Sequence, residues 1–256
     1  MQLDPAASDF RLSAHDTLPS TNTEALMRAR AGETGPLWIT AQVQTAGRGR
    51  RGNAWVSTCG NLYATLLLRD PAPADNAPEL SFVTALAVHD ALAERAPALR
   101  EQLALKWPND VICGGKKLAG ILIESEAIGA SLTVAIGIGV NCLHHPVGTA
   151  YPATNLASAG AMVSAEDVFT GLSDAMARRL TQWGRGEGFA SVRAEWLARV
   201  HGLGNEIRVR LPGREFGGRF EALDERGRLL LRLADGTMQT ITAGDVFPVG
   251  AARGAS

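Results

Sequence analysis

Residues 37–55 read LWITAQVQTAGRGRRGNAW, an apolar stretch that runs straight into a loop of glycines and arginines. The apolar half predicts a strand over residues 37–43, and residues 62–68 predict a second strand beyond the loop. Glycine lets backbone N–H groups approach a ligand, and arginine holds a carboxylate or phosphate with two hydrogen bonds. We therefore expect a loop that is loose when empty and closes over an anion. A solvated turn or a nonspecific nucleic-acid contact is the alternative.

The composition is that of a globular protein of 256 residues with a formal net charge of −1. Such a charge disfavours a protein that mainly coats nucleic acid. The sequence lacks both an apolar run of about 18 residues, which could span a bilayer, and a signal-peptide pattern at its start, so we expect a cytoplasmic location. Three widely spaced cysteines favour buried or free thiols over a disulfide framework or a zinc site: Cys59, Cys113 and Cys142.

A polar run, Ser20-Thr21-Asn22, opens a predicted helix that ends near Gly32. Thr21 and Glu24 have the spacing of a capping box. The hydroxyl groups at this helix start serve either as caps or as ligand contacts.

Residues 103–124 predict a strand that ends at Lys106, a turn through Asn109 and Asp110, and a hairpin whose turn is residues 114–116. Lys117 stands at the start of the returning strand, which we expect over residues 118–124. A lone lysine there is commonly edge decoration. Beside Lys106, Asn109 and Asp110 it becomes a candidate for polar chemistry at one end of a sheet.

Residues 132–141 are almost wholly apolar and predict a central strand. Gly137 and Gly139 within it indicate close approach by a packing group or by a ligand. His89, on a helix predicted over residues 79–95, and the pair His144-His145 are weak evidence for a metal.

Further helices are predicted over residues 164–183 and 189–200, and short alternating strands follow over residues 206–211, 215–223, 228–233 and 237–242. This change in character predicts a catalytic domain over residues 1–202, a small β domain over residues 203–249 and a disordered tail over residues 250–256.

Five motifs occur in a fixed order: Ser-Thr-Asn at 20–22, Gly-Arg-Gly-Arg-Arg-Gly at 47–52, Lys-Trp-Pro-Asn-Asp at 106–110, Lys-Leu-Ala-Gly-Ile-Leu-Ile-Glu at 117–124 and Gly-Ile-Gly-Val-Asn at 137–141. In this the chain resembles the biotin protein ligases, the biotin–[biotin carboxyl carrier protein] ligase family. The resemblance implies an α+β fold, with a mixed β-sheet and packed helices of the class II synthetase-like biotin–lipoate ligase type and a small C-terminal SH3-like β-barrel. Residues 1–19 are too few for a DNA-binding domain, so we expect the ligase-only type.

The resemblance also implies roles for individual residues. Those implied for biotin are Ser20, Thr21, Asn22, Gln44, Gly47, Arg48, Gly49, Arg50, Lys117, Gly120 and Gly137. Those implied for ATP or the adenylate are Arg50, Lys106, Asn109, Asp110 and Asn141, with Asp110 the candidate for Mg²⁺. Lys117 and Arg50 are the catalytic candidates.

The implied reaction joins biotin and ATP into biotinyl-5′-AMP and then transfers biotin to a lysine of a biotin carboxyl carrier protein. We expect no specific DNA binding and no membrane partner, and either a monomer or a homodimer. A lipoate or octanoate ligase is the first alternative, although Gln44 and residues 20–22 favour biotin. A nucleic-acid-binding module without enzymatic activity is the second.

Overall fold

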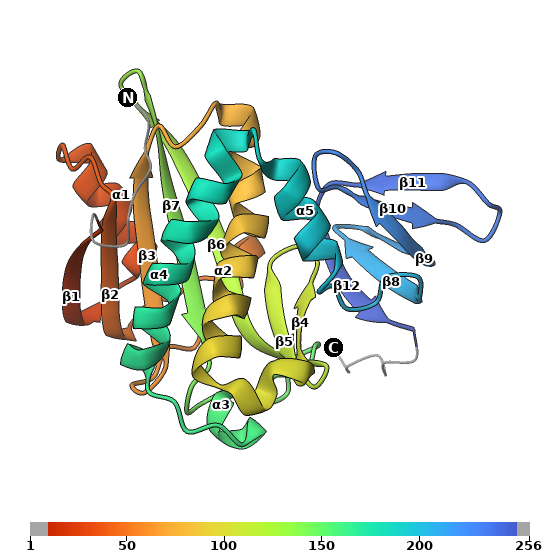
Figure 1. The fold of residues 1–256 in the computed structure, drawn as a ribbon, viewed down its shortest axis with the longest axis horizontal. Helices are drawn as coiled ribbons and strands as arrows, with labels where there is room; N and C mark the ends of the chain where they lie inside the picture. The colour runs from red at the N-terminus through yellow and green to blue at the C-terminus, as the bar shows by residue number, and fades with distance from the viewer. Residues whose placement is uncertain (1–9, 250–256) are drawn as a thin grey trace.

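The computed structural model describes residues 10–249, so the tail predicted from Gly250 lies outside the described residues. A seven-stranded sheet carries helices on its faces, and a separate five-stranded sheet lies at the C-terminal end (Figure 1). In the large sheet β1 pairs with β2 in parallel, whereas the other neighbouring strands are antiparallel. The predicted α+β fold with a mixed sheet is confirmed.

The large sheet, here called the catalytic sheet, has the order β1-β2-β3-β7-β6-β5-β4. Its middle strand is β7, as predicted from its apolar sequence. A strand in this position is covered on both faces, which is why nearly all of its residues are apolar. The strand bounds are β1 Arg11–Leu18, β2 Leu37–Gln44, β3 Leu62–Arg69, β4 Leu103–Lys106, β5 Asp110–Cys113, β6 Lys116–Ile128 and β7 Ser131–Val140.

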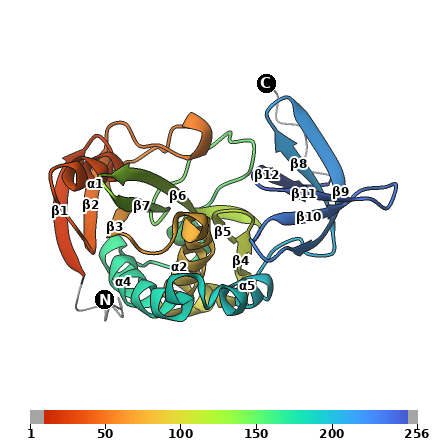
Figure 2. The same cartoon turned by 90° about the horizontal axis from the view of Figure 1, so that it is seen from above.

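Helices cover both faces of this sheet. α2 (Leu80–Arg95), α4 (Ala165–Trp183) and α5 (Phe189–Leu197) lie on one face, and α1 (Thr21–Arg30) lies on the other (Figure 2). Accordingly, one apolar cluster joins α2 and α4 to the sheet, and a second joins α1 to β2. Because α2 packs on the sheet with α4 and α5 on its flanks, most of its side chains are buried.

The structure corrects the predicted start of α1. Ser20, and not Thr21, is the N-cap, and its side chain accepts a hydrogen bond from Thr23 N. The Thr21 hydroxyl instead donates to Gln44 Oε1 at 3.1 Å. The hydroxyl groups at the helix start therefore divide between a cap and a tertiary contact.

Other differences concern element lengths. β6 continues past its predicted end at Glu124 to Ile128, because β7 pairs with it as far as Ser131. β1 is an edge strand of eight residues that pairs with β2. The short helix α3 (Leu156–Ala159) has no periodic pattern long enough to predict it.

The small sheet, here called the C-terminal sheet, has the order β11-β10-β9-β8-β12 and is antiparallel in every neighbouring pair. Its bounds are β8 Glu206–Leu211, β9 Arg214–Leu223, β10 Leu229–Arg232, β11 Met238–Ile241 and β12 Asp245–Pro248. The sequence predicted the first four of these strands but not β12, which is too short for an alternating pattern. Within residues 10–249, no helix combines the length and the apolar character that a membrane crossing requires.

Candidate functional site

A cavity of about 540 Å³ lies between the catalytic sheet, the glycine/arginine loop and the edge of the C-terminal sheet. Fourteen of the fifteen predicted site residues line it: Ser20, Thr21, Asn22, Gln44, Arg48, Gly49, Arg50, Lys106, Asn109, Asp110, Lys117, Gly120, Gly137 and Asn141. They come from α1, the ends of several strands and the loop, so only the fold brings them together. Gly47 is the exception. Its carbonyl accepts a hydrogen bond from Trp55 N at 2.9 Å at the base of the loop.

One end of the cavity is built around Thr21 and Gln44. Gln44 Oε1 accepts hydrogen bonds from Thr21 N at 2.9 Å and from the Thr21 hydroxyl at 3.1 Å. Gln44 Nε2 donates to the Ser57 hydroxyl at 3.0 Å, which fixes the orientation of the amide. This end presents hydroxyl and amide groups in a fixed arrangement, as recognition of a neutral polar ring requires.

Asn22 occupies the centre of a buried polar network at the same end. Its amide nitrogen donates to Glu124 Oε2 at 2.8 Å, and its carbonyl oxygen lies 2.7 Å from the Thr65 hydroxyl. A Cβ atom on Gly137 would collide with this amide. The close approach that the sequence indicated at Gly137 is therefore made by the Asn22 side chain.

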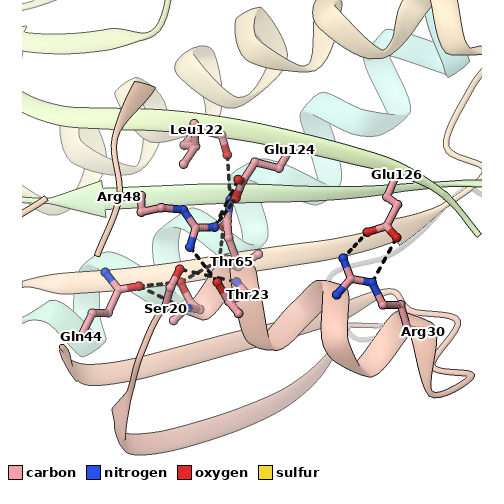
Figure 3. Close-up of polar contacts among 11 residues, drawn as sticks. Ser20, Thr23, Arg30, Gln44, Arg48, Thr65, Leu122, Glu124 and Glu126 are labelled. Atoms are coloured by element: carbon pink, nitrogen blue, oxygen red, sulfur yellow. Dashed lines mark hydrogen bonds and ion pairs between the residues drawn. The ribbon is translucent and has the colours of Figure 1, made fainter. Parts of the chain in front are cut away.

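Arg48 joins the loop to two other elements. Its Nη1 donates to the Thr23 hydroxyl at 2.8 Å, and its Nη2 donates to the Glu124 carboxylate at 3.2 and 3.1 Å (Figure 3). The sequence led us to expect a loose loop, whereas here a protein carboxylate holds its first arginine. Glu124 thus contacts both Arg48 and Asn22, a role that the motif at residues 117–124 did not predict.

Arg50 points to the opposite end of the cavity. Its Nη1 donates to Asn109 Oδ1 at 2.9 Å, and Asn109 Nδ2 donates in turn to Ile121 O at 2.6 Å. Burial lowers the pKa of the Arg50 guanidinium, and the nearby Asp245 carboxylate opposes that effect. Arginine stays charged throughout the accessible pH range, so a half-buried cation faces this part of the cavity.

Two lysines share one carboxylate beside Arg50. Lys106 Nζ lies 3.0 Å from Asp110 Oδ2, and Lys117 Nζ lies 2.7 Å from Asp110 Oδ1. Burial alone would raise the pKa of Asp110, but the charges of Lys117 and Lys106 outweigh it and lower the pKa to about 2. The group therefore carries a net positive charge and suits an anionic ligand.

Trp55 covers the glycines of the cavity wall. Cβ atoms on Gly120 and Gly139 would lie 2.9 and 2.5 Å from its ring, and Lys117 Nζ lies 5.3 Å from the ring centroid. The glycines of β6 and β7 thus make room for an indole that borders the predicted catalytic lysine. Trp55 is the last residue of the stretch 37–55, but no local sequence pattern predicted it as a site residue.

The comparisons with known proteins agree with this geometry. Residues 15–141 match the model of the Biotin/lipoate A/B protein ligase family, and residues 202–247 match that of the biotin protein ligase C-terminal domain. The biotin–[acetyl-CoA-carboxylase] ligase of Paracoccus denitrificans is 44% identical over 89% of this chain and 96% of that protein. The chain belongs to the biotin protein ligase family.

Two further members show how far the similarity extends. The biotin–[acetyl-CoA-carboxylase] ligase of Mycobacterium tuberculosis is 34% identical over 89% of this chain and 85% of its own length. The solved biotin protein ligase of Aquifex aeolicus in complex with biotin and ATP is 27% identical, with a TM-score of 0.75 over 93% of this chain and 97% of that one. The similarity therefore includes both sheets of this biotin protein ligase.

The nucleotide residues predicted from the family motifs lie at the lysine end of the cavity. Asn141 Nδ2 donates to Thr154 O at 3.0 Å, and Lys106 Nζ lies 4.4 Å from the centroid of the Tyr151 ring. Burial and the Asp110 charge raise the pKa of Tyr151 to about 12, so its hydroxyl stays protonated. Tyr151 was not predicted, because no local pattern marks a loop aromatic as a cavity residue.

Mg²⁺ is compatible with Asp110. Among the described residues no group of three or more His, Cys, Asp or Glu side chains could hold a metal ion, and His144 and His145 form no such site. The buried Oδ1 of Asp110 faces Lys117 but has no partner in hydrogen-bond geometry within the described chain. Both oxygens of the Asp110 carboxylate already face ammonium groups, so an Mg²⁺ ion at this end would rely mainly on water and on substrate phosphates, its usual partners beside one or two carboxylates.

Proposed function

We propose that this biotin protein ligase activates biotin with MgATP to biotinyl-5′-AMP and pyrophosphate. It then transfers biotin to the ε-amine of a lysine on a biotin carboxyl carrier protein. The observation that supports the proposal most directly is the distribution of polar and charged groups in one cavity. A neutral polar end at Thr21 and Gln44 lies opposite a cationic end formed by Arg50, Lys106 and Lys117.

The first step brings two anions together. A biotin carboxylate oxygen attacks the α-phosphorus of ATP, and the bond between the α- and β-phosphates breaks to release pyrophosphate. Lys117 and Arg50 are the cations that lower the repulsion between carboxylate and phosphate and stabilise the charge that develops at the α-phosphoryl group. Mg²⁺, which Asp110 would help to hold, supplies further charge neutralisation on the phosphates when bound.

The second step needs no protein nucleophile. The neutral lysine amine of the carrier attacks the carbonyl carbon of the mixed anhydride, the bond from that carbon to the phosphate oxygen breaks, AMP leaves, and the proton lost by the nitrogen passes to solvent. With a pKa of about 2, Asp110 is too weak a base to take the proton of that amine. The contribution of the chain at this step is to hold the adenylate and exclude water, and we assign that task to the loop that carries Arg48 and Arg50.

The residue assignments are part of the same proposal. The polar end, with Ser20, Thr21, Asn22 and Gln44, would bind the biotin ring system. Arg48 and Gly49 would border the activated carboxyl group, while Lys106, Asn109 and Asn141 would bind the nucleotide. The Arg48 guanidinium already contacts Glu124 and Thr23. Arg48 would therefore contact the activated carboxyl group through its backbone N–H, or its guanidinium would leave these two partners.

The organisation of the chain and its location are proposed as well. We place the catalytic domain at residues 1–202 and the small domain at residues 203–249, supported by the family matches at residues 15–141 and 202–247. A cytoplasmic location is supported by three free cysteines, Cys59, Cys113 and Cys142, because reducing compartments keep thiols free.

A lipoate or octanoate ligase remains the alternative, because one family model includes both biotin and lipoate ligases. The alternative requires a slot for a flexible acyl chain, whereas the end at Thr21 and Gln44 is polar and hydrogen-bonded.

The deciding experiment mixes the protein with MgATP, an acetyl-CoA carboxylase carrier domain and equal amounts of biotin, lipoate and octanoate. Intact mass of the carrier should show biotin addition at one lysine, and addition of lipoate or octanoate alone would select the alternative. A carrier with that lysine changed to arginine is the control.

A further inference from the structure

Two consecutive arginines of the loop reach the C-terminal sheet. Arg51 Nη1 lies 2.8 Å from Asp245 Oδ2, and Arg50 Nη1 lies 3.5 Å from Gly244 O. Asp245 is the first residue of β12, the edge strand of that sheet. The loop and its partner are 194 positions apart in the sequence, so this contact exists only in the folded chain.

The C-terminal sheet is held firmly against the catalytic sheet. Trp107 Nε1 donates to Gly227 O at 3.0 Å in a buried position, and Arg193 Nη1 donates to Leu223 O at 2.7 Å. β12 is thereby fixed at the rim of the cavity, where Asp245 and Phe247 form part of the lining. An anchor on β12 is therefore joined to these contacts through β8 and β9.

The loop itself has a backbone that needs such an anchor. Arg51 has φ +56°, in the left-handed region that residues other than glycine adopt at a cost. At the other end of the loop, Arg48 is bound to Thr23 and Glu124. The loop is thus attached through Arg48, through the contact of Arg50 with Asn109, and through the contact of Arg51 with Asp245.

We propose that Asp245 is a positioning residue through which the C-terminal sheet holds the glycine/arginine loop over the cavity and retains the adenylate. This role rests on the proposed function, since it concerns release of biotinyl-5′-AMP. It also gives the C-terminal sheet a defined task at the site: Asp245 acts on Arg51, and Arg51 fixes the path of the loop. Asp245 need not touch either substrate.

The exposure of the pair defines the expected size of the effect. The Arg51 and Asp245 side chains are 31% and 44% exposed, so the ion pair is partly screened by water. Its loss should leave the fold intact and open the loop about two- to fivefold more often, the range that such a pair supports. The effect should also diminish at high salt, because salt screens partly exposed charges.

The first experiment follows amide hydrogen exchange of residues 47–54 in the protein without substrates. Arg51→Gln and Asp245→Asn should each speed this exchange two- to fivefold, and the charge-swapped double variant Arg51→Asp with Asp245→Arg should slow it again. Glu221→Gln is the matched control. Glu221 forms a 3.0 Å ion pair with Arg232 at similar exposure but does not line the cavity. Unchanged exchange in both single variants would overturn the proposal.

The second experiment measures release of preformed biotinyl-5′-AMP in a chase with unlabelled adenylate. Both single variants should release it two- to fivefold faster, with less than additive effects when Arg51→Gln and Asp245→Asn are combined. Fully additive effects would mean that the two residues act separately and would also overturn the proposal. If the protein forms no adenylate at all, the proposed function fails, and the exchange experiment still tests the contact between loop and sheet.

Discussion

Lys117 Nζ lies 2.7 Å from Asp110 Oδ1, while Lys106 Nζ lies 3.0 Å from the other oxygen of the same carboxylate. One buried carboxylate therefore positions two ammonium groups at the cationic end of the cavity. Because it balances only one of their charges, the group keeps a net positive charge there. This relationship explains how a lysine next to a hairpin turn comes to face the cavity.

Removal of the Lys117 ammonium tests its proposed role most simply. We expect Lys117→Ala to lower the rate of adenylate formation about 10²- to 10³-fold, the usual size for loss of one group that stabilises transition-state charge. Lys106 still pairs with Asp110 in this variant, so the fold should persist. The measurement is single-turnover formation of biotinyl-5′-AMP. Lys116→Ala, at the exposed neighbouring position, is the control, and equal rates in the two variants would remove Lys117 from its role.

Acid pH should reveal the buried ion-pair group. The pKa of Asp110 is lowered from 3.8 to about 2 in the folded protein, so its charge contributes stability that is fully present above about pH 4. That contribution is lost as the pH falls from about 4 to 2, where the carboxylate takes up a proton. The free energy of unfolding of the wild type should therefore approach that of Asp110→Asn over this window. A constant difference between the two proteins from pH 6 to pH 2 would contradict the lowered pKa.

Gly137 tests the geometry of the biotin end. An added Cβ collides with the Asn22 amide, so Gly137→Ala should displace Asn22 from Thr65 and Glu124. We expect the KM for biotin to rise at least tenfold, with a smaller rise in the KM for ATP. Gly217→Ala is the matched control, because a Cβ there meets nothing within 4 Å. If both variants bind biotin as the wild type does, this end of the cavity does not bind the biotin ring.

Arg50 tests retention of the intermediate. Arg50→Gly removes the contacts to Asn109 and Gly244, and the loop loses the half-buried positive charge of the guanidinium. We expect adenylate to escape and to label bystander proteins, measured as biotin on added serum albumin in the absence of a carrier. Albumin labelling no stronger than with the wild type would show that Arg50 does not retain the intermediate.

Local patterns were enough to predict most of the fold. The hairpin between β5 and β6 follows from its Gly-Gly turn, and the central position of β7 follows from an apolar run that no surface strand could carry. The family motifs predicted the candidate site residues, and fourteen of these residues line one cavity. The N-cap of α1 was misplaced by one residue because Ser20 and Thr21 are both good caps, and only the tertiary contact of Thr21 with Gln44 decides between them.

The residues that sequence reasoning missed act through distant partners. Glu124 meets Arg48 across 76 positions, and Asp245 meets Arg51 across 194. Phe247 reaches the cavity from β12, a strand too short to predict. Spacing along a chain reports neighbours on one helix or strand, whereas these contacts depend on how two sheets are placed beside each other.

The central claim is that this chain activates biotin. The most direct test is exchange of labelled pyrophosphate into ATP by the purified protein with magnesium, comparing biotin, lipoate and octanoate as the acid. The structure predicts exchange with biotin alone, because an acid whose carboxylate lies near Lys117 places its other end against the hydrogen-bonding groups of Thr21 and Gln44, which suit a polar ring. Exchange with none of the three acids, in folded protein, would contradict the account.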